Sequence, residues 1–386
     1  MVAVGRPAHI VQVVQSIDRG GLEMMAVELA IALRARGLGS SLIALSEGGR
    51  LEERLRDADV HFESLGTARY WSPATHAAVL RRLRRRSATV VHTHHLPSLL
   101  NAGPAARAMG ISRVVHTEHA HAYLDEEPRF RPMLRWAAHM ANAVALVGDA
   151  LVPYFAQTVR IAPARLHVVP NGIDTNRFRP MSSEEVDARR RAAGLPQGRF
   201  LIGAVGRLAA VKNYGLLLRA AARARAAGGS IALALVGDGE ERESLESLVQ
   251  ELGLQADTTF MGWRSDVAEL VGTFDALAVT STSEALPLVV LEAMGCGVPV
   301  VSTDVGEIPR VLDGVAGLIV PSNDVEALAA ALTRVAADER LRLTMGEHGR
   351  SRVCEAYSHS TMVDRYLALY GIREVEHESR LTPTRA

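Results

Sequence analysis

Apolar and polar positions alternate in two ways along nearly the whole chain. Short apolar runs, as at residues 9–15, 89–92 and 231–236, alternate with longer stretches whose apolar positions recur at helical spacing, as at residues 75–86. Short apolar runs that alternate with amphipathic helices are typical of a parallel sheet covered by helices on both faces. The pattern therefore predicts an α/β protein in which strands and helices follow one another.

The alternation is interrupted once, near the middle of the chain. The turn Pro170-Asn171-Gly172 is followed by a polar, arginine-rich segment without a clear strand, and a second series of strands and helices begins at residue 200. Clusters of Pro, Asn and Gly end regular structure. We therefore predict one Rossmann-like domain in residues 1–175, a second in residues 176–355, and a last helix with a polar tail in residues 356–386.

Composition indicates an ordinary globular protein. The chain has 386 residues, of which 48% are hydrophobic and 22% charged, and 43 basic residues balance 43 acidic ones. No global field would recruit nucleic acid, so we expect no nucleic-acid partner. Cys296 and Cys354 are far apart in the sequence and give no disulfide framework, and no apolar run approaches the ~18 residues of a membrane span. We expect a cytoplasmic protein.

Residues 281–295 carry the pattern of a helix start that binds an anion. Ser281 and Ser283 can cap a helix, and Pro287 has the fixed φ that a first helical turn tolerates. The free N–H groups of such a helix start, with the positive end of its dipole, favour phosphate. Glu284 precedes the expected helix and Glu292 lies within it. These carboxylates would suit the hydroxyls of a sugar and a ribose joined through a diphosphate; ordinary surface glutamates are the alternative.

Glycine-containing loops follow several predicted strands. Gly20 and Gly21 precede the first long helix, and a later strand ends in Gly206 and Arg207, with Lys212, the single lysine of the chain, five residues further on. Glycine lets backbone approach a ligand closely, and α/β sheets bind ligands beyond the carboxyl ends of their strands. None of these loops reads G-x-G-x-x-G, so the fingerprint of dinucleotide binding is missing.

Histidines gather at the ends of two predicted strands in the first half. They are His92, His94 and His95 after one strand, and His116, His119 and His121, with Glu118, after the next. Zinc ligation is one interpretation, although cysteine partners and His-Glu-x-x-His spacing are missing. Hydrogen bonding to a sugar or an acceptor is the favoured interpretation, and solvated loop histidines are the third.

Taken together, these segments resemble the retaining glycosyltransferases of family four. Glu284 and Glu292 match the E-x7-E motif of that family, and residues 206–213 match its G-R-L-x-x-x-K-N motif. Residues 170–174, 236–239 and 262–266 match further family segments in the same order, so the resemblance spans nearly the whole chain. Ala285 stands where members often have glycine. The resemblance implies the GT-B fold, in which two Rossmann-like domains enclose a donor/acceptor cleft.

The resemblance also implies a division of labour between the domains. The first domain would bind the acceptor and the second the nucleotide sugar, and the last helix would cross back to the first domain. Arg207 and Lys212 would bind the diphosphate and stabilise it as it leaves. Glu284 would contact the donor sugar and Glu292 the ribose.

Further contacts with the donor are implied in the same way. His119, or alternatively His116, would contact the sugar from the first domain, and the loop near Trp263 would meet the nucleotide base. The remaining expected binding positions lie in glycine loops and at the helix start: Gly20, Gly21, Gly206, Gly237, Pro287, Leu288 and Val289.

The implied function is transfer of a sugar from a nucleotide diphosphate sugar to a hydroxyl, with retention at the anomeric carbon. A glycan or lipid-linked acceptor is expected, in bacterial polysaccharide or glycolipid assembly, and no cofactor or metal. A non-catalytic nucleotide-sugar binder is the alternative. An NAD-dependent oxidoreductase would show the missing glycine fingerprint, and in a pyridoxal-phosphate phosphorylase Lys212 would stand in the wrong motif.

A run of arginines at residues 81–86 closes a predicted helix. Cations at a helix C-terminus suit the dipole, and this account is sufficient. Contact with anionic lipid is the alternative, since each cation near such a surface contributes on the order of 1 kcal/mol. That alternative would place the protein peripherally at the inner face of a membrane.

Overall fold

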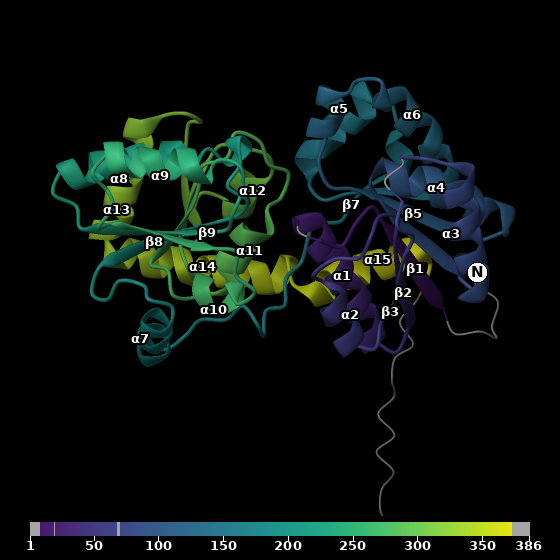
Figure 1. The fold of residues 1–386 in the computed structure, drawn as a ribbon, viewed down its shortest axis with the longest axis horizontal. Coiled ribbons are helices and arrows are strands. Elements are labelled where there is room, and N and C mark those ends of the chain that lie inside the picture. Colours follow the sequence, from purple (N-terminus) through teal and green to yellow (C-terminus); the bar gives the residue numbers. More distant parts are fainter. Residues whose placement is uncertain (1–7, 19, 68–69, 373–386) are drawn as a thin grey trace, which may run out of the picture.

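The computed structural model describes residues 8–18, 20–67 and 70–372, and these form two α/β lobes side by side (Figure 1). Each lobe contains one parallel sheet with helices on both faces. The predicted α/β, GT-B class of two Rossmann-like domains is therefore confirmed. The polar tail expected after about residue 373 lies outside the described residues.

The first sheet has seven strands in the order β3-β2-β1-β4-β5-β6-β7 within the described residues. Its strands are β1 (His9–Val14), β2 (Gly39–Ala44), β3 (His61–Ser64), β4 (Val90–His94), β5 (Arg113–Glu118), β6 (Ala143–Leu146) and β7 (Leu166–Val168). Its α-helices are α1 (Gly21–Ala35), α2 (Glu52–Asp57), α3 (Pro73–Arg85), α4 (His95–Ala108), α5 (Ala122–Glu126) and α6 (Phe130–Ala137). Short turns complete it at η1 (Ala138–Met140), η2 (Asp149–Leu151), η3 (Tyr154–Thr158) and η4 (Pro163–Arg165).

The second sheet has six strands in the order β10-β9-β8-β11-β12-β13 within the described residues. Its strands are β8 (Phe200–Val205), β9 (Ile231–Val236), β10 (Thr258–Gly262), β11 (Ala276–Val279), β12 (Val300–Thr303) and β13 (Gly317–Val320). The helices of this half are α7 (Ser183–Ala192), η5 (Ala210–Lys212), α8 (Tyr214–Ala226), α9 (Arg242–Glu251), α10 (Val267–Val271), α11 (Leu288–Gly295), α12 (Ile308–Leu312), α13 (Val325–Ala337) and α14 (Glu339–Ala356).

The last helix, α15 (His359–Tyr370), returns to the first lobe, where it packs on α1 and β5 (Figure 1). Two backbone hydrogen bonds hold the chain where it crosses. The Ile173 N–H donates to the Tyr357 carbonyl, and the His359 N–H donates to the Ile173 carbonyl. The crossing implied by the family resemblance is thus present. The precise limits of the three predicted segments stay a prediction.

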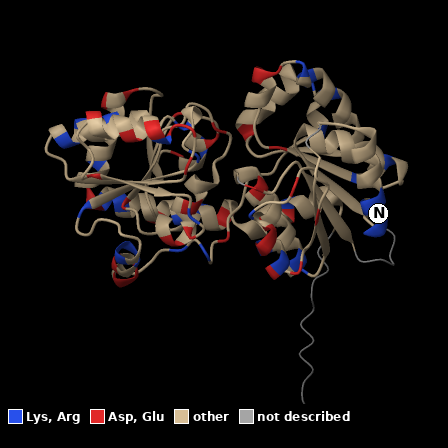
Figure 2. Cartoon of the chain, viewed as in Figure 1, with Lys and Arg blue, Asp and Glu red and all other residues tan. Residues whose placement is uncertain are grey.

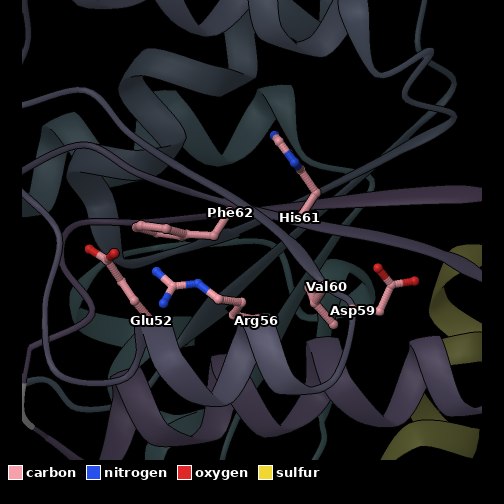
Figure 3. A pocket seen from close by; sticks show the side chains of 6 residues that line it. All are labelled: Glu52, Arg56, Asp59, Val60, His61 and Phe62. Carbon is pink, nitrogen blue, oxygen red and sulfur yellow. The ribbon is translucent and has the colours of Figure 1, made fainter.

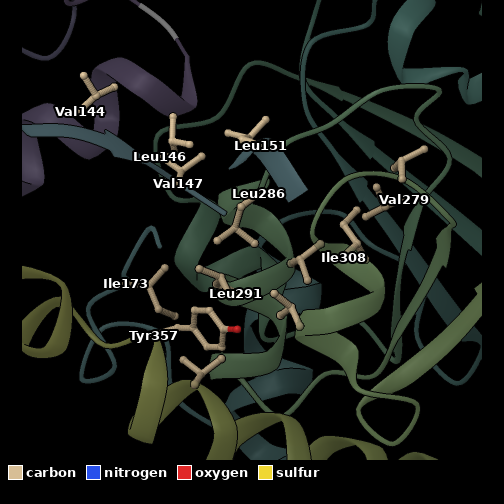
Figure 4. Close-up of a cluster of buried hydrophobic side chains, with 14 of the residues drawn as sticks. Val144, Leu146, Val147, Leu151, Ile173, Val279, Leu286, Leu291, Ile308 and Tyr357 are labelled. Atoms are coloured by element: carbon tan, nitrogen blue, oxygen red, sulfur yellow. The ribbon is translucent and has the colours of Figure 1, made fainter. Parts of the chain in front are cut away.

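A buried apolar cluster continues from one lobe into the other (Figure 4). Leu146 and Leu151 of the first lobe belong to the same cluster as Leu286 and Leu291 of the second. Burying this surface stabilises the contact between lobes by roughly 25 cal/mol per Å² of apolar area. Charged residues of both signs are distributed over the helices of both lobes (Figure 2).

Two predicted strands differ from the observed ones. The strands expected to end at residues 92 and 115 continue to His94 and Glu118. Their histidines therefore lie partly inside the first sheet rather than in loops.

Candidate active site

Two reversals of strand order bring the predicted site loops together. The order reverses between β1 and β4 in the first sheet and between β8 and β11 in the second. At such a point the connections leave in opposite directions and open a crevice beyond the carboxyl ends of the strands. The segments that follow these four strands contain Gly20 after β1, His95 after β4, Lys212 after β8 and Glu284 after β11.

A helix starts close to Pro287, as the sequence predicts, but the caps expected at Ser281 and Ser283 are wrong, because a proline without a side-chain acceptor occupies the N-cap position. Pro287 is the N-cap residue, and the helix begins at Leu288. The first N–H groups of a helix, here those of Leu288 and Val289, have no partner within the helix. Asn171 Nδ2 donates to the carbonyl of Leu286 at 3.0 Å, so the turn between the domains holds the chain just before this helix start.

The glycine loop of the first domain faces the same helix start. A Cβ added to Gly21 would lie 4.0 Å from Leu288 Cδ1, which is ordinary van der Waals contact. Gly21 is also the first residue of α1, with Gly20 as its N-cap. Two helix starts, one from each domain, therefore meet across the crevice, and both favour an anion between them.

Lys212 and Glu284 form an ion pair in this crevice. Lys212 Nζ lies 2.5 Å from Glu284 Oε1, and Ser281 Oγ donates to the same oxygen at 2.8 Å. The Lys212 side chain is 24% exposed and that of Glu284 14%. Thr280 Oγ1 donates to the Lys212 carbonyl at 2.9 Å, which fixes the lysine loop against the loop after β11. The lysine is held but remains within reach of a ligand.

Arg207 lies on the lysine loop but is not part of this ion pair. Its side chain is 69% exposed, and its one ion pair among the described residues is a long one to Glu240 at 3.9 Å. Just before it, Gly206 passes against Gly237, where a Cβ would lie 1.9 Å from the Gly206 carbonyl oxygen. Gly237, with φ 136°, is therefore required by the close passage of two backbones.

Glu292 is the least satisfied carboxylate of the crevice. Its side chain makes no hydrogen bond or ion pair with any described residue. Burial raises the pKa of the Glu292 carboxyl to about 7, against the opposing effect of the Arg177 charge. A carboxylate in this condition has acceptor capacity to offer to ligand hydroxyls.

Trp263 directly follows β10 and is 44% exposed. The guanidinium carbon of Arg50, from the loop before α2, lies 4.7 Å from the ring centroid. This cation–π contact joins the two domains beside the position expected for the base.

His119, the predicted sugar contact, directly follows β5 at the carboxyl end of that strand. It is half-buried, and its Nε2 lies 3.2 Å from Nδ1 of the fully buried His94. Its ring also stacks on that of His95 at 6.0 Å between centroids. Burial lowers the pKa of His119 well below its ordinary value, so the imidazole is neutral.

The alternative sugar contact, His116, is not accessible at the surface of the first domain. Its side chain is fully buried in β5, where it is hydrogen-bonded to Glu118 Oε1 at 2.9 Å and to Thr93 Oγ1 at 2.9 Å. His92 is equally buried, between Tyr370 OH and Thr117 Oγ1. For zinc, no group of three or more His, Cys, Asp or Glu side chains in the described ranges is arranged to hold a metal ion.

A contact between the domains was not predicted. Glu307, which precedes α12, accepts hydrogen bonds from the backbone N–H groups of Asp149 at 3.0 Å and Ala150 at 3.2 Å. Arg310 also forms an ion pair with Asp149. Glu307 and Ala150 line a cavity of about 370 Å³ that also contains Glu284. A single Glu in a turn carries no sequence pattern that could have identified this role.

A second cavity, of about 360 Å³, lies on the first domain between α2 and β3 (Figure 3). Glu52, Arg56 and Phe62 line it, and it contains none of the predicted site residues. Each helix in the described ranges is too short or too polar to cross a membrane.

Comparisons with known proteins agree with this geometry. The family model described as Glycosyltransferase Family 4 matches residues 19–177, and that described as Glycosyl transferases group 1 matches residues 185–352. The chain is 37% identical over 227 residues to a D-inositol 3-phosphate glycosyltransferase of Corynebacterium jeikeium, in a match that covers 56% of this chain and 53% of the relative.

Two further likenesses cover more of the chain. One relative is the UDP-Gal:alpha-D-GlcNAc-diphosphoundecaprenol alpha-1,3-galactosyltransferase of Escherichia coli, 26% identical over 303 residues, with 76% of this chain and 78% of the relative covered. The crystal structure of Anabaena HepE in complex with UDP and glucose superposes with a TM-score of 0.83 at 21% identity, over 94% of this chain and 99% of that one.

The two sheets, their crevice and these likenesses define a glycosyltransferase with the GT-B fold. The two family models account for both domains, and the chain belongs to glycosyltransferase family 4.

Proposed function

We propose that the enzyme transfers a sugar from a uridine diphosphate sugar to a hydroxyl of a glycan or lipid-linked acceptor, with retention at the anomeric carbon. The retaining outcome is that of the family to which the chain belongs. HepE is bound to UDP, and the E. coli relative is named for a UDP-sugar donor and a lipid-diphosphate-linked acceptor. These names support the choice of uridine and of the acceptor class.

The pair of Lys212 with Glu284 at the start of α11 carries this proposal. The diphosphate lies between this helix start and Gly21, so that Leu288 and Val289 donate N–H groups to it while Lys212 meets its charge. Arg207 turns in from solvent to the same phosphates. Glu284 then accepts from a sugar hydroxyl, Glu292 from the ribose, and the base lies near Trp263.

In the reaction, the bond between the anomeric carbon and the diphosphate oxygen breaks, and the acceptor oxygen bonds to that carbon from the same face. The acceptor proton passes to the departing phosphate oxygen, so the products are the glycoside and the protonated diphosphate. Groups aimed at the charge that grows on the leaving oxygen lower the barrier. Here they are Lys212, Arg207 and the α11 start, and His119 positions the sugar.

We propose that this reaction needs no metal and no cofactor, because two cations and a helix start already meet the diphosphate. Chelation by EDTA should leave turnover unchanged. Loss of activity that magnesium or manganese restores would contradict metal independence.

The test of the function is a panel of nucleotide sugars. A uridine donor at 100 times its Kd should stabilise the enzyme by ~2.7 kcal/mol in thermal unfolding. The donor that stabilises is then incubated with simple glycosides, and the product's anomeric configuration is read by proton NMR. Stabilisation without any transfer or hydrolysis would indicate a non-catalytic binder, and an inverted product would overturn the retaining mechanism.

Contact with an anionic membrane is a second part of the proposal. Arg82 and Arg86 pair with Glu63, whereas Arg81, Arg84 and Arg85 are exposed. The wild-type protein should sediment with vesicles that contain anionic lipid. A variant with these three arginines changed to Gln should bind the vesicles less. Equal sedimentation of both would refute this contact.

A further inference from the structure

A chain of buried polar side chains reaches His119 from the middle of the first sheet. Gln12 lies in β1 and His94 is the last residue of β4; both are fully buried. His94 Nε2 lies 2.9 Å from Gln12 Oε1, and His94 Nδ1 lies 3.2 Å from His119 Nε2. The strands β1, β4 and β5 are neighbours, so this chain runs across the sheet toward the crevice.

The two imidazoles are neutral. Burial lowers the pKa of both His94 and His119 well below the ordinary value. A neutral imidazole has one N–H and one bare nitrogen, and the partner of one nitrogen decides the state of the other. The positions of the protons on Gln12, His94 and His119 are therefore coupled.

The direction of the hydrogen bonds follows from the amide of Gln12. Its carbonyl oxygen can only accept, so His94 must carry its proton on Nε2 and leave Nδ1 bare. His94 Nδ1 then accepts, and His119 must donate from Nε2. His119 Nδ1 is left bare and makes no hydrogen bond with any described residue.

We infer that Gln12, acting through His94, is a positioning residue that fixes His119 in the Nε2–H tautomer, so that its bare Nδ1 accepts a hydrogen bond from a hydroxyl of the bound sugar. This inference rests on the proposed contact of His119 with the donor sugar. The new part of the inference is that Gln12 and His94 set which nitrogen of His119 faces the sugar hydroxyl.

The unpaired atom of Gln12 supports this role. Gln12 Nε2 is buried and has no hydrogen-bond partner among the described residues, and a buried donor in this state is destabilising. An apolar side chain of similar size would avoid that penalty and fill the same space. The tautomer follows the amide, because an amide turned to face His94 with Nε2 would donate to it and give the Nδ1–H tautomer of both histidines.

A nearby group offers a matched control. His92 lies on the same strand as His94, is equally buried, and has its Nδ1 2.7 Å from Tyr370 OH. Tyr370→Phe and Gln12→Met each remove one buried hydrogen bond from an imidazole. The first affects His92, which is not hydrogen-bonded to His119, and the second affects His94, which is. The two variants lose comparable interactions and differ in whether His119 is affected.

The test is a two-bond proton–nitrogen correlation spectrum of the full chain labelled with 15N-histidine. The signals of His119 are assigned by their loss in His119→Asn. Wild type and Tyr370→Phe should show His119 as the Nε2–H tautomer, and Gln12→Met should show a mixture of both. A mixed or Nδ1–H tautomer in the wild type would overturn the inference, and so would an unchanged tautomer in folded Gln12→Met.

Kinetics separate positioning from a structural effect. Gln12→Met should lower kcat/KM for the donor roughly tenfold, the size of one neutral hydrogen bond, and leave UDP affinity within twofold. An equal loss of UDP affinity, or full activity despite a mixed tautomer, would contradict the positioning role. Because the spectrum is read without substrate, an enzyme that failed to use sugar nucleotides would refute the proposed function and leave the tautomer result standing.

Discussion

The two sides of the crevice hold their functional groups in opposite ways. On the donor side, Arg207 is largely exposed, Lys212 has a single carboxylate partner, and Glu292 makes no hydrogen bond or ion pair with a described residue. On the other side, His94 and His119 are neutral and linked by a hydrogen bond to each other. We propose that this difference reflects the charge of the group that each side binds.

Charged groups are costly to bury without a partner, so groups intended for a diphosphate stay hydrated or lightly paired until it binds. Lys212 illustrates this arrangement, because Glu284 neutralises it in the absence of ligand. Neutral imidazoles carry no such penalty and can be fixed in advance. The donor side should therefore respond to ligand, and the histidine side should not.

The largest expected effect is at the lysine. Lys212→Ala should lower kcat at least ~100-fold, because it removes a cation aimed at the charge of the transition state, and Arg207→Ala should act in the same range. Steady-state assays with saturating donor measure this. Arg223→Ala is the control, since Arg223 is an exposed cation on α8 that pairs with Glu326. Near-wild-type turnover in both site variants would refute the proposal that Lys212 and Arg207 stabilise the departing diphosphate.

A second prediction divides the two carboxylates. Loss of a hydrogen bond to a charged group costs ~1.5 to 3 kcal/mol. Glu292→Ala should weaken binding of bare UDP by this amount, whereas Glu284→Ala should leave UDP affinity nearly intact and weaken binding of the complete donor. Calorimetry with both ligands on both variants is the measurement. Equal losses of UDP affinity in the two variants would refute the division.

The raised pKa of Glu292 gives a smaller, pH-dependent effect. With a pKa of about 7, the carboxyl is largely protonated at pH 6 and largely ionised at pH 8. In the proposed complex the ribose hydroxyls donate to the ionised form of Glu292, so UDP affinity should rise several-fold over this range. Glu292→Gln should lack that rise, and it corrects for the titration of UDP itself. The same slope in both proteins would contradict the prediction.

The same raised pKa should make the folded protein less stable as pH rises, whereas it makes UDP binding stronger. The folded state holds the Glu292 proton up to about pH 7, whereas an ordinary Glu releases it near pH 4.5. The free energy of unfolding of the wild type should therefore fall relative to Glu292→Gln as pH rises through this window. Chemical denaturation at pH 5 and pH 8 checks the sign.

The smallest expected effect is at the contact between domains. Glu307→Gln keeps one of the two oxygens that accept from the N–H groups of Asp149 and Ala150. Losing the other hydrogen bond should weaken the contact between the domains by about 1 kcal/mol. KM for the donor should rise roughly fivefold with kcat nearly unchanged, and Glu326→Gln on the surface should change neither. A change in kcat alone would show that Glu307 does not act on donor binding through this contact between the domains.

The sequence predicted those parts of the site that depend on local pattern. The strand β9 and the helix start after Pro287 follow from apolar spacing and from proline's fixed φ. The burial of His92 and His116 could not be predicted in this way, because strand length is set by pairing with neighbours far along the chain. Gln12 and Glu307 act through contacts 82 and about 157 residues away, which no local pattern records.

The central claim is that the diphosphate binds between Lys212 and the start of α11, and a crystal structure of the enzyme with UDP tests it most directly. The account predicts phosphate oxygens within about 3 Å of Lys212 Nζ and of the N–H groups of Leu288 and Val289. It also predicts a Glu292 carboxylate that accepts from the ribose. UDP bound with its phosphates away from this helix start, for example in the cavity between α2 and β3, would contradict it.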